Sequence, residues 1–203
     1  MSTAHPSPLG GRRPTRGELP QFYGYPVDDR LPEPGAAPLN LLIVGVNPGL
    51  WTAAVNAPFA YPGNRFWPSL DRAGIISPAI DCSTGMSDAD EQRLRDLGIG
   101  ITNLVPRATA RADELDKADL IDGAKRVVKL TNQLQPKRVA VAGITAFRTG
   151  FENRQAKLGK QDTAQIAHWP EHIPLWVVPQ PSGLNTHENI DSLAQKWRAV
   201  MDT

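Results

Sequence analysis

The sequence predicts an α/β fold, a three-layer α/β/α domain around a central, mostly parallel sheet of about four to five strands. Short, continuous apolar runs recur along the chain, as is typical of strands that are covered on both faces. Amphipathic segments of helical length lie between these runs. Alternation of this kind indicates a parallel sheet sandwiched between helices.

Four apolar runs have the length of a strand. The first, LNLLIVGV, spans residues 39–46 and is almost entirely apolar. The other three span residues 99–105, 138–143 and 173–178. Runs without regular polar alternation belong in the interior of a sheet, where helices cover both faces.

Two helices are predicted from their start and stop signals. Residues 64–75 form a helix that tolerates Pro68 because a proline in the first turn breaks no backbone hydrogen bond. Residues 87–98 form a second helix, in which Ser87 is a suitable N-cap and Gly98 a stop signal.

Three further helices follow in the second half of the chain. Residues 117–135 form a long helix, residues 144–151 a short one, and residues near 187–201 the last. The long helix gathers its apolar side chains on one face, as expected for packing on a sheet. These side chains are Leu120, Ala124, Val127, Val128 and Leu134.

Length and composition indicate one domain preceded by an arm. Residues 39–203 suffice for a single domain, since domains cluster around ~100–200 residues. Residues 1–38 are rich in Pro and Gly, so we expect a flexible arm that becomes anchored near residues 22–25. The arginines near its front could touch phosphates, but a solvated end is the favoured interpretation. They are Arg12, Arg13 and Arg16.

The overall charge and the cysteine content exclude several classes. A net charge of +1 argues against a protein that coats nucleic acid by bulk charge. Cys82 is the only cysteine, so a disulfide framework and a cysteine-based metal site are not expected. The sequence shows no apolar signal segment or membrane span, and we expect a cytoplasmic protein, associated with the nucleoid if the source is bacterial.

The unusual loops follow the predicted strands. In open parallel sheets, ligands bind in the crevice beyond the carboxyl ends of the strands. The loops at these ends contain Asn47–Gly49, Pro106 with Arg107, Gly143, and PQPSGLN at residues 179–185. The sequence therefore predicts a ligand site along this edge of the sheet.

The first of these loops combines a side-chain amide with an aromatic ring. Asn47 is fixed by Pro48 and Gly49, and Phe59 stands between two prolines. An amide offers a donor and an acceptor but is no base at neutral pH. An aromatic ring beside it suits a flat, heteroaromatic ligand such as a nucleobase. A capped turn with core aromatics is an equally good interpretation of these residues alone.

The last loop carries an apolar residue among polar neighbours. Gly183 lets the backbone approach a ligand closely, and Leu184 follows it. Leu184 is either a packing anchor or a wedge that enters a base stack. Taken alone, the loop favours the anchor.

Six segments, in order, resemble the mismatch-specific uracil-DNA glycosylases, the branch of the uracil-DNA glycosylase superfamily that includes the thymine-DNA glycosylases. The segments are GVNPGL (45–50), PFAYPGNRFW (58–67), GITNLVPRATARADEL (100–115), KRVAVAGITAFRTGF (137–151), LGKQ (158–161) and QPSGLN (180–185). Each is weak alone, whereas the ordered set is specific and covers roughly residues 39–200. The resemblance implies a uracil-DNA glycosylase-like fold.

The resemblance also implies a role for each matching residue. Asn47 corresponds to the catalytic asparagine that positions the attacking water, and Phe59 to the aromatic that stacks on the flipped base. Backbone groups around Val46 and Phe59 correspond to those that contact the polar edge of the base, with Thr52 and Gln180 beside them. The remaining matches correspond to the DNA-wedge and DNA-binding residues Pro181, Ser182, Gly183, Leu184, Asn185 and Lys160.

Three positions depart from the family pattern. Gln180 stands where the family usually has asparagine, which puts efficiency and base choice in doubt. Trp51 stands where a small residue is expected; it narrows the pocket mouth, stacks on a base, or packs without effect. After Leu184, the residues Asn185–His187 supply no arginine to probe the opposite strand.

Other chemistry is disfavoured. His168 and His172 have a ligand-like spacing, but Pro170 between them argues against a metal site, and we expect no metal. Arg107 contacts a phosphate or pairs with Glu114, and the pairing is favoured. A dinucleotide site is unsupported because GxGxxG is missing after the strands.

The sequence therefore predicts a monofunctional, cofactor-free glycosylase that hydrolyses the N-glycosidic bond of uracil, and of damaged bases such as ethenocytosine, in mismatched DNA. Base flipping would expose the scissile bond and initiate base excision repair. The expected partner is double-stranded DNA, and the expected state a monomer. The main alternative is a DNA-damage-binding homologue with weak or altered base specificity; a hydrolase of free nucleosides is disfavoured because it has no use for a wedge.

Overall fold

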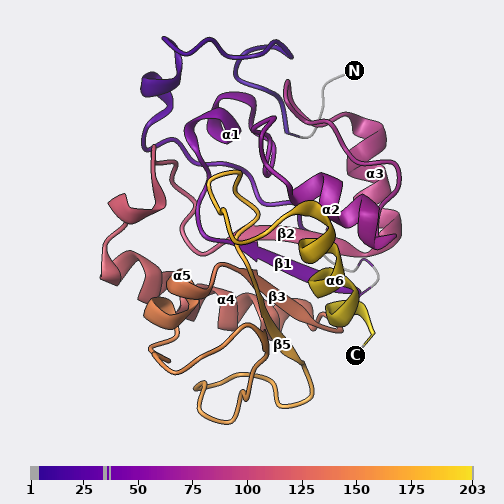
Figure 1. Cartoon of the computed structure of the whole chain (residues 1–203), viewed down its shortest axis with the longest axis vertical. Helices are drawn as coiled ribbons and strands as arrows, with labels where there is room; N and C mark the ends of the chain where they lie inside the picture. Colours follow the sequence, from indigo (N-terminus) through magenta and orange to yellow (C-terminus); the bar gives the residue numbers. More distant parts are fainter. Residues whose placement is uncertain (1–4, 34–35, 37, 203) are drawn as a thin grey trace.

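The computed structural model describes residues 5–33, 36 and 38–202. A five-stranded sheet in the order β2-β1-β3-β5-β4 forms its centre, with every pairing parallel except that of β4 with β5 (Figure 1). The strands are β1 (Leu41–Gly45), β2 (Ile99–Asn103), β3 (Val139–Ala142), β4 (Gly159–Lys160) and β5 (Leu175–Val178). The predicted α/β fold is confirmed.

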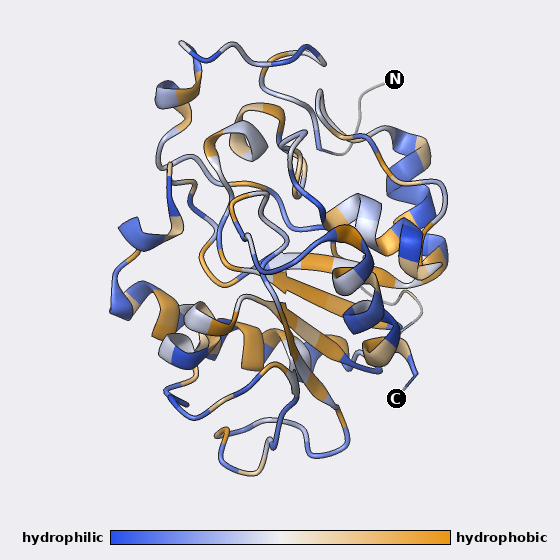
Figure 2. Ribbon diagram, in the orientation of Figure 1, coloured by the Kyte–Doolittle hydropathy of each residue, from blue (hydrophilic) through white to orange (hydrophobic). Residues whose placement is uncertain are grey.

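Alternate side chains of β1 point to opposite faces of the sheet. Leu41 and Ile43 belong to the core on the side of helices α2 (Phe66–Ala73) and α6 (Ile190–Met201). Leu42 and Val44 belong to the core on the opposite side. All five residues of β1 are buried, which explains their continuous apolar run, and Figure 2 shows the strands as the most hydrophobic part of the chain.

The opposite core is closed by α4 (Lys117–Leu134) and α5 (Ile144–Gly150), which pack on each other. Helix α3 (Asp88–Leu97) lies beside β2. The predicted caps are present at α3. The Ser87 side chain accepts a hydrogen bond from the backbone N–H of Asp90, and Gly98 ends the helix with a left-handed φ of 63°.

The sequence missed two short elements. Helix α1 (Leu50–Val55) has only six residues and begins directly after a Pro-Gly pair without a side-chain cap, so it shows no helical periodicity. Strand β4 has two residues, too few for any alternating pattern. The last helix begins at Ile190 rather than near 187, because the side chain of Asn189 caps it.

The described part of residues 1–38 packs on the rest of the chain, with contacts near the expected anchor at residues 22–25 and beyond it. Phe22, in the short 3-10 helix η1 (Leu19–Phe22), and Val27 are buried against the alanines of α1. Arg30 exchanges two backbone hydrogen bonds with Ile101 on β2, with N···O distances of 2.8 and 2.7 Å. The expectation for residues 1–4, 34, 35 and 37 lies outside the described residues.

The attachment of this segment has a physical cause that composition does not reveal. Strand β2 is an edge strand, and its free backbone groups pair with any extended segment that lies beside it. The side chain of Arg30 then enters the interior, where Nε donates to Glu91 at 2.8 Å and the two terminal nitrogens donate to the carbonyls of Asp28 and Asn56. Both partners of the ion pair are buried.

Within the described part of the chain, no helix has both the length and the apolar character needed to cross a membrane.

Replacing Arg30 by alanine is expected to lower the free energy of unfolding by about 3–5 kcal/mol, because Glu91 would keep a buried charge without its partner. Urea unfolding followed by circular dichroism measures the change. Arg12→Ala is the matched control, since its ion pair with Glu18 lies at the surface and should contribute little. Equal losses in the two variants would contradict a structural role for the buried pair.

Candidate active site

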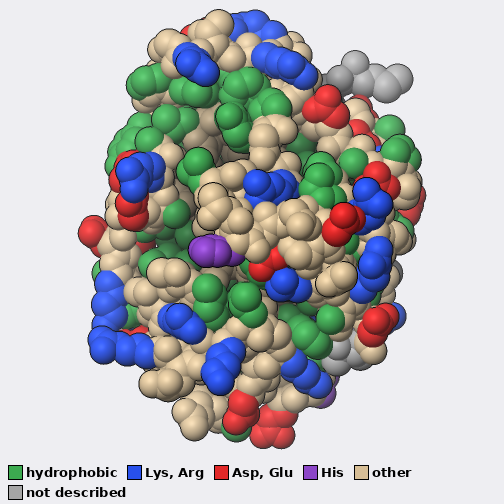
Figure 3. All heavy atoms as spheres, viewed as in Figure 1, with side chains coloured by type: hydrophobic (Ala, Val, Ile, Leu, Met, Phe, Trp, Pro, Cys, Tyr) green, Lys and Arg blue, Asp and Glu red, His purple; other side chains and the backbone are tan. Residues whose placement is uncertain are grey.

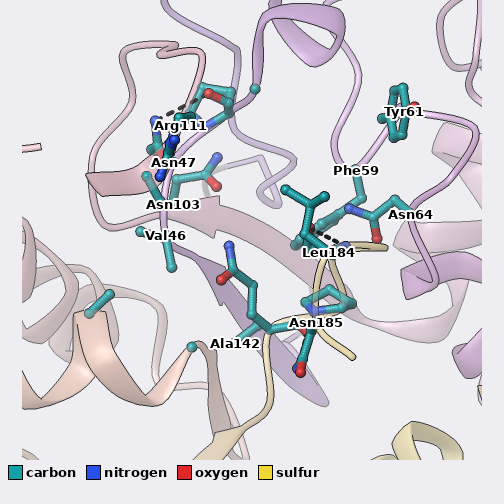
Figure 4. Close-up of a pocket in the computed structure, with 18 of the residues that line it drawn as sticks. Val46, Asn47, Phe59, Tyr61, Asn64, Asn103, Arg111, Ala142, Leu184 and Asn185 are labelled. Carbon is teal, nitrogen blue, oxygen red and sulfur yellow. Dashed lines mark hydrogen bonds between the residues drawn. The ribbon is translucent and has the colours of Figure 1, made fainter. Parts of the chain in front are cut away.

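A cleft of about 1770 Å³ opens at the carboxyl ends of the parallel strands. Segments that follow β1, β2, β3 and β5 line it, as predicted for the crevice of a parallel sheet. Figure 3 shows hydrophobic side chains gathered around the hollow, and Figure 4 shows its interior. Asn47 and Asn103 lie on one side, with Phe59 and Tyr61 on the other.

The amide nitrogen of Asn47 is held by the loop that follows β2. Nδ2 donates to Thr109 Oγ1 at 2.7 Å, with longer contacts to the carbonyls of Pro48 at 3.2 Å and Arg107 at 3.4 Å. The hydroxyl of Thr109 donates its only hydrogen to the carbonyl of Arg111 at 2.7 Å. In its contact with Asn47, Thr109 must therefore be the acceptor.

These partners fix which way the Asn47 amide faces. Carbonyl oxygens accept hydrogen bonds and never donate them, so the nitrogen must face Pro48 and Arg107. The oxygen, Oδ1, accepts no hydrogen bond from any described residue and is left for a ligand or a water molecule. Asn47 can therefore orient water through Oδ1, although an amide cannot deprotonate it strongly.

Phe59 forms the opposite wall of the cleft. One face of its ring stacks on Phe66, with the ring centroids 3.8 Å apart and the planes 21° apart. The ring also lines the cleft, so its other face is the one available to a flat ligand. Its φ of 54° is unusual for a bulky residue, a conformation that surrounding contacts must hold.

A buried cluster next to Phe59 holds the preceding carbonyl. Trp67 Nε1 donates to the carbonyl of Pro58 at 3.1 Å, and the Cys82 thiol lies 3.3 Å from the same oxygen. Burial raises the pKa of Cys82 to about 12, so the thiol stays protonated and unreactive at neutral pH. This contact supports the left-handed backbone of Phe59.

Two residues of the cleft have backbone N–H groups without a backbone acceptor among the described residues. The N–H groups of Val46 and Phe59 donate no backbone hydrogen bond to a described residue, and both residues line the cleft. The side chains of Val46 and Thr52 are buried in its wall. The structure thus brings the sequence-predicted residues Asn47, Val46, Thr52 and Phe59 together.

Asn103 was missed by the sequence analysis. It ends β2 in register with Gly45 at the end of β1, and it lines the same cleft. A Cβ on Gly45 would lie 2.4 Å from Asn103 Oδ1 and 3.3 Å from Phe59 Cζ. Gly45 therefore lets both side chains approach the end of β1. A polar amide at a strand end was the available signal, the same one that identified Asn47.

Trp51 is explained by packing. Its Nε1 donates to the carbonyl of Ser83 at 3.0 Å, and its ring packs against the core. Tyr61 meets it edge-to-face, with centroids 5.7 Å apart, and is itself 57% exposed at the cleft. Trp51 thus packs against the core and contacts Tyr61 in the cleft wall.

Leu184 does not act as a packing anchor, because its side chain is 89% exposed. The loop around it is closed by its own hydrogen bonds. Asn185 N–H donates to the Ser182 carbonyl at 3.0 Å, and the Asn185 amide donates to the Gln180 carbonyl at 3.1 Å. Pro181 is buried, and Gly183 lies at the surface of the turn. All six residues from Gln180 to Asn185 line the cleft.

Lys160 lies away from this cleft. Strand β4 runs antiparallel to β5, so the chain leads from Gly159, opposite Val177, to Lys160, opposite Trp176. This direction carries Lys160 away from the carboxyl ends of the parallel strands. Its side chain lines a separate hollow with Lys137 and His172.

The sequence suggested that Arg107 pairs with Glu114. In the structure it pairs with Asp119 instead. Its Nη2 lies 2.5 Å from Asp119 Oδ2. Asp119 also accepts the N–H of Asp116 in the cap of α4, so the ion pair joins the loop after β2 to that helix. The hydrogen bond from Arg107 lowers the pKa of Asp119 below its usual value.

Among the described residues, no group of three or more His, Cys, Asp or Glu side chains gathers as a metal site would require. His172, one of the two histidines with a ligand-like spacing, lies at the surface, with its Nε2 3.0 Å from Oε1 of Gln135.

The fold and the cleft define an α/β protein with a fixed amide and an aromatic wall at the carboxyl edge of its sheet. The family model of the uracil DNA glycosylase superfamily matches residues 32–202, and the chain belongs to this superfamily. Members of the superfamily are hydrolytic glycosylases that act on DNA. The match includes every cleft residue named above.

The ion pair of Arg107 and Asp119 predicts a pH-dependent contribution to stability. Because the folded-state pKa of Asp119 is lowered from the usual 3.8, its carboxylate stabilises the fold above that pH and loses this effect as the pH falls through the folded-state pKa. Thermal melts should show Asp119→Asn less stable than the parent at pH 6, with the difference shrinking below pH ~3.8. A difference that is the same at both pH values would contradict the assignment.

Proposed function

We propose that this protein is a monofunctional uracil-DNA glycosylase that hydrolyses the N-glycosidic bond of uracil in mismatched double-stranded DNA. It acts as a monomer without a cofactor and initiates base excision repair in the cytoplasm. The observation that carries the proposal is the Asn47 amide, whose nitrogen is fixed by Thr109 while Oδ1 is left free opposite the ring of Phe59.

The chemistry agrees with these groups. Cleavage of the bond builds positive charge on the sugar and negative charge on the departing base. The N–H groups of Val46 and Phe59 are fixed donors that can stabilise a negative base edge. Asn47 orients the water but is a poor base, so the reaction depends on a good leaving group. Uracil and electron-poor damaged bases such as ethenocytosine meet that requirement better than normal bases.

Preference for mismatched DNA follows from the cost of extruding the base. A duplex hides the scissile bond, and a mismatched base costs least to unstack and unpair. The exposed Leu184 would fill the space that the base leaves. The ordered motifs shared with the mismatch-specific branch support the same assignment.

The alternative, a damage-binding homologue without efficient cleavage, rests on Gln180, whose side chain is exposed where the family usually has a shorter amide. Trp51 no longer supports it, because its indole is tied to the protein by Ser83. The free oxygen of Asn47 favours cleavage.

Asn47→Ala should lower the rate of uracil release from a G:U duplex by at least ~100-fold, since the water would lose its orienting group. Asn47→Asp should raise the rate or broaden the base range, because a carboxylate is a stronger base. Duplexes with G:U, A:U, ethenocytosine or hypoxanthine, and single-stranded uracil DNA, are incubated with each protein and then cleaved by alkali at abasic sites.

The outcomes of this assay separate the candidates. Strand breaks with the parent protein support the glycosylase, and gel shifts without breaks support the binding protein. If Asn47→Ala releases uracil as fast as the parent, the assignment of Asn47 is wrong.

Thr109→Val should lower kcat about 10-fold or more with a smaller change in KM, because Asn47 would lose its shortest hydrogen bond while the cleft keeps its shape. Thr109→Ser is the control, since serine retains the hydroxyl. Single-turnover rates on a G:U duplex measure the effect. Parent-like kcat in Thr109→Val would show that this contact does not orient the amide.

A further inference from the structure

Leu184 can act as a wedge only if its loop is held in place. An apolar side chain that is 89% exposed has almost no packing of its own to hold it in place. To fill a gap in a base stack it must nevertheless resist being pushed back when the duplex closes around it. The loop that carries it therefore needs support from elsewhere in the molecule.

Arg65 provides a contact of this kind. It precedes α2, and its guanidinium reaches the loop more than a hundred residues further along the chain. Nη1 donates to the carbonyls of Asn185 at 2.8 Å and Glu188 at 2.7 Å, and Nη2 lies 3.3 Å from the carbonyl of Gly183. The residues on both sides of Leu184 are thus held by one side chain.

The planar shape of the guanidinium suits this task. Its donors are fixed in one plane, so three carbonyls bound to it are fixed relative to one another. Each carbonyl accepts from a charged donor, which makes the contact stronger than one between neutral groups. Lysine has a single nitrogen on a flexible stem and cannot reproduce the arrangement.

The backbone contacts support the same geometry. Arg65 N–H donates to the carbonyl of Pro181 at 2.9 Å, at the start of the loop. A Cβ on Gly183 would lie 2.7 Å from the carbonyl oxygen of Gly63, so the two segments touch directly. Figure 4 shows Leu184 near Phe59 and Asn64. The leucine loop and the loop of the stacking ring are therefore joined at Arg65.

We propose that Arg65 is the positioning residue of the leucine loop: it holds Leu184 at a fixed place relative to Phe59, so that the wedge and the ring act together on an extruded base. This inference rests on the proposed function and deepens it. Without the Arg65 side chain, the loop would keep its own hydrogen bonds but lose its fixed position relative to Phe59, and restoring that position on binding DNA would cost affinity and rate.

A double-mutant cycle tests whether Arg65 acts through Leu184. kcat/KM on a G:U duplex is measured for the parent, Arg65→Ala, Leu184→Ala and the double variant. Arg65→Ala should lose about 10-fold or more in the parent but less than about 2-fold in the Leu184→Ala background, since coupled residues are not additive. Arg65→Lys should fall between the parent and Arg65→Ala.

Two controls separate positioning from folding. Arg72→Ala removes an arginine of the adjoining helix α2 whose ion pair with Asp191 is exposed, and it should keep parent activity. Fluorescence of 2-aminopurine placed next to uracil should rise less with Arg65→Ala than with the parent, because less base is extruded.

A general loss of folding would instead lower the melting temperature in both backgrounds. If Arg65→Ala does not fold, Arg65→Lys takes its place in the cycle.

The same cycle is measured by binding to a duplex with a tetrahydrofuran abasic analogue opposite guanine, which needs no chemistry. Coupling in binding with no uracil release by the parent would retain this inference and overturn the proposed glycosylase. Losses that multiply independently in both assays, or parent-like behaviour of Arg65→Ala, would overturn the role of Arg65.

Discussion

The site depends on the hydrogen bond between Asn47 and Thr109. Strands β1 and β2 are parallel and in register, so their carboxyl ends lie level, and the loops that leave them meet. Thr109 accepts a hydrogen bond from the amide nitrogen, and the amide oxygen is left without a partner among the described residues. A flexible asparagine side chain would sample several orientations, whereas this one is oriented before any ligand binds, which reduces the entropy to be lost on binding.

The cleft is supported from three directions outside the strand ends. The N-terminal segment pairs with β2, and the Arg30 side chain donates a hydrogen bond to the carbonyl of Asn56, the residue that caps the end of α1. The Trp67–Cys82 contact holds the carbonyl before Phe59. Arg65 joins the ring's loop to the leucine loop. Each support uses a backbone carbonyl as the point of attachment.

The sequence was sufficient for the fold and for part of the site. Asn47 could be found because it interrupts the end of a continuous apolar run, and the strand–helix alternation gave the sheet. Asn103 carried the same signal as Asn47, an amide at the end of a strand, but only the strand register shows that it faces the same cleft. Arg65 could not be assigned, because its contacts are with a loop far along the chain. Lys160 matched a family motif, yet the antiparallel direction of β4 leads it away from the cleft. A motif identifies residue types; topology decides which of them meet.

The most direct measurement of the central claim is a crystal structure with a G:U duplex whose uridine carries 2′-fluoro-arabinose, a sugar that resists cleavage. We expect an extruded uracil stacked on Phe59, with its polar edge on the N–H groups of Val46 and Phe59. A water molecule should lie on Oδ1 of Asn47, near the sugar carbon. A uracil that stays in the base stack, or one that occupies the cleft with Asn47 turned away from the sugar, would contradict it.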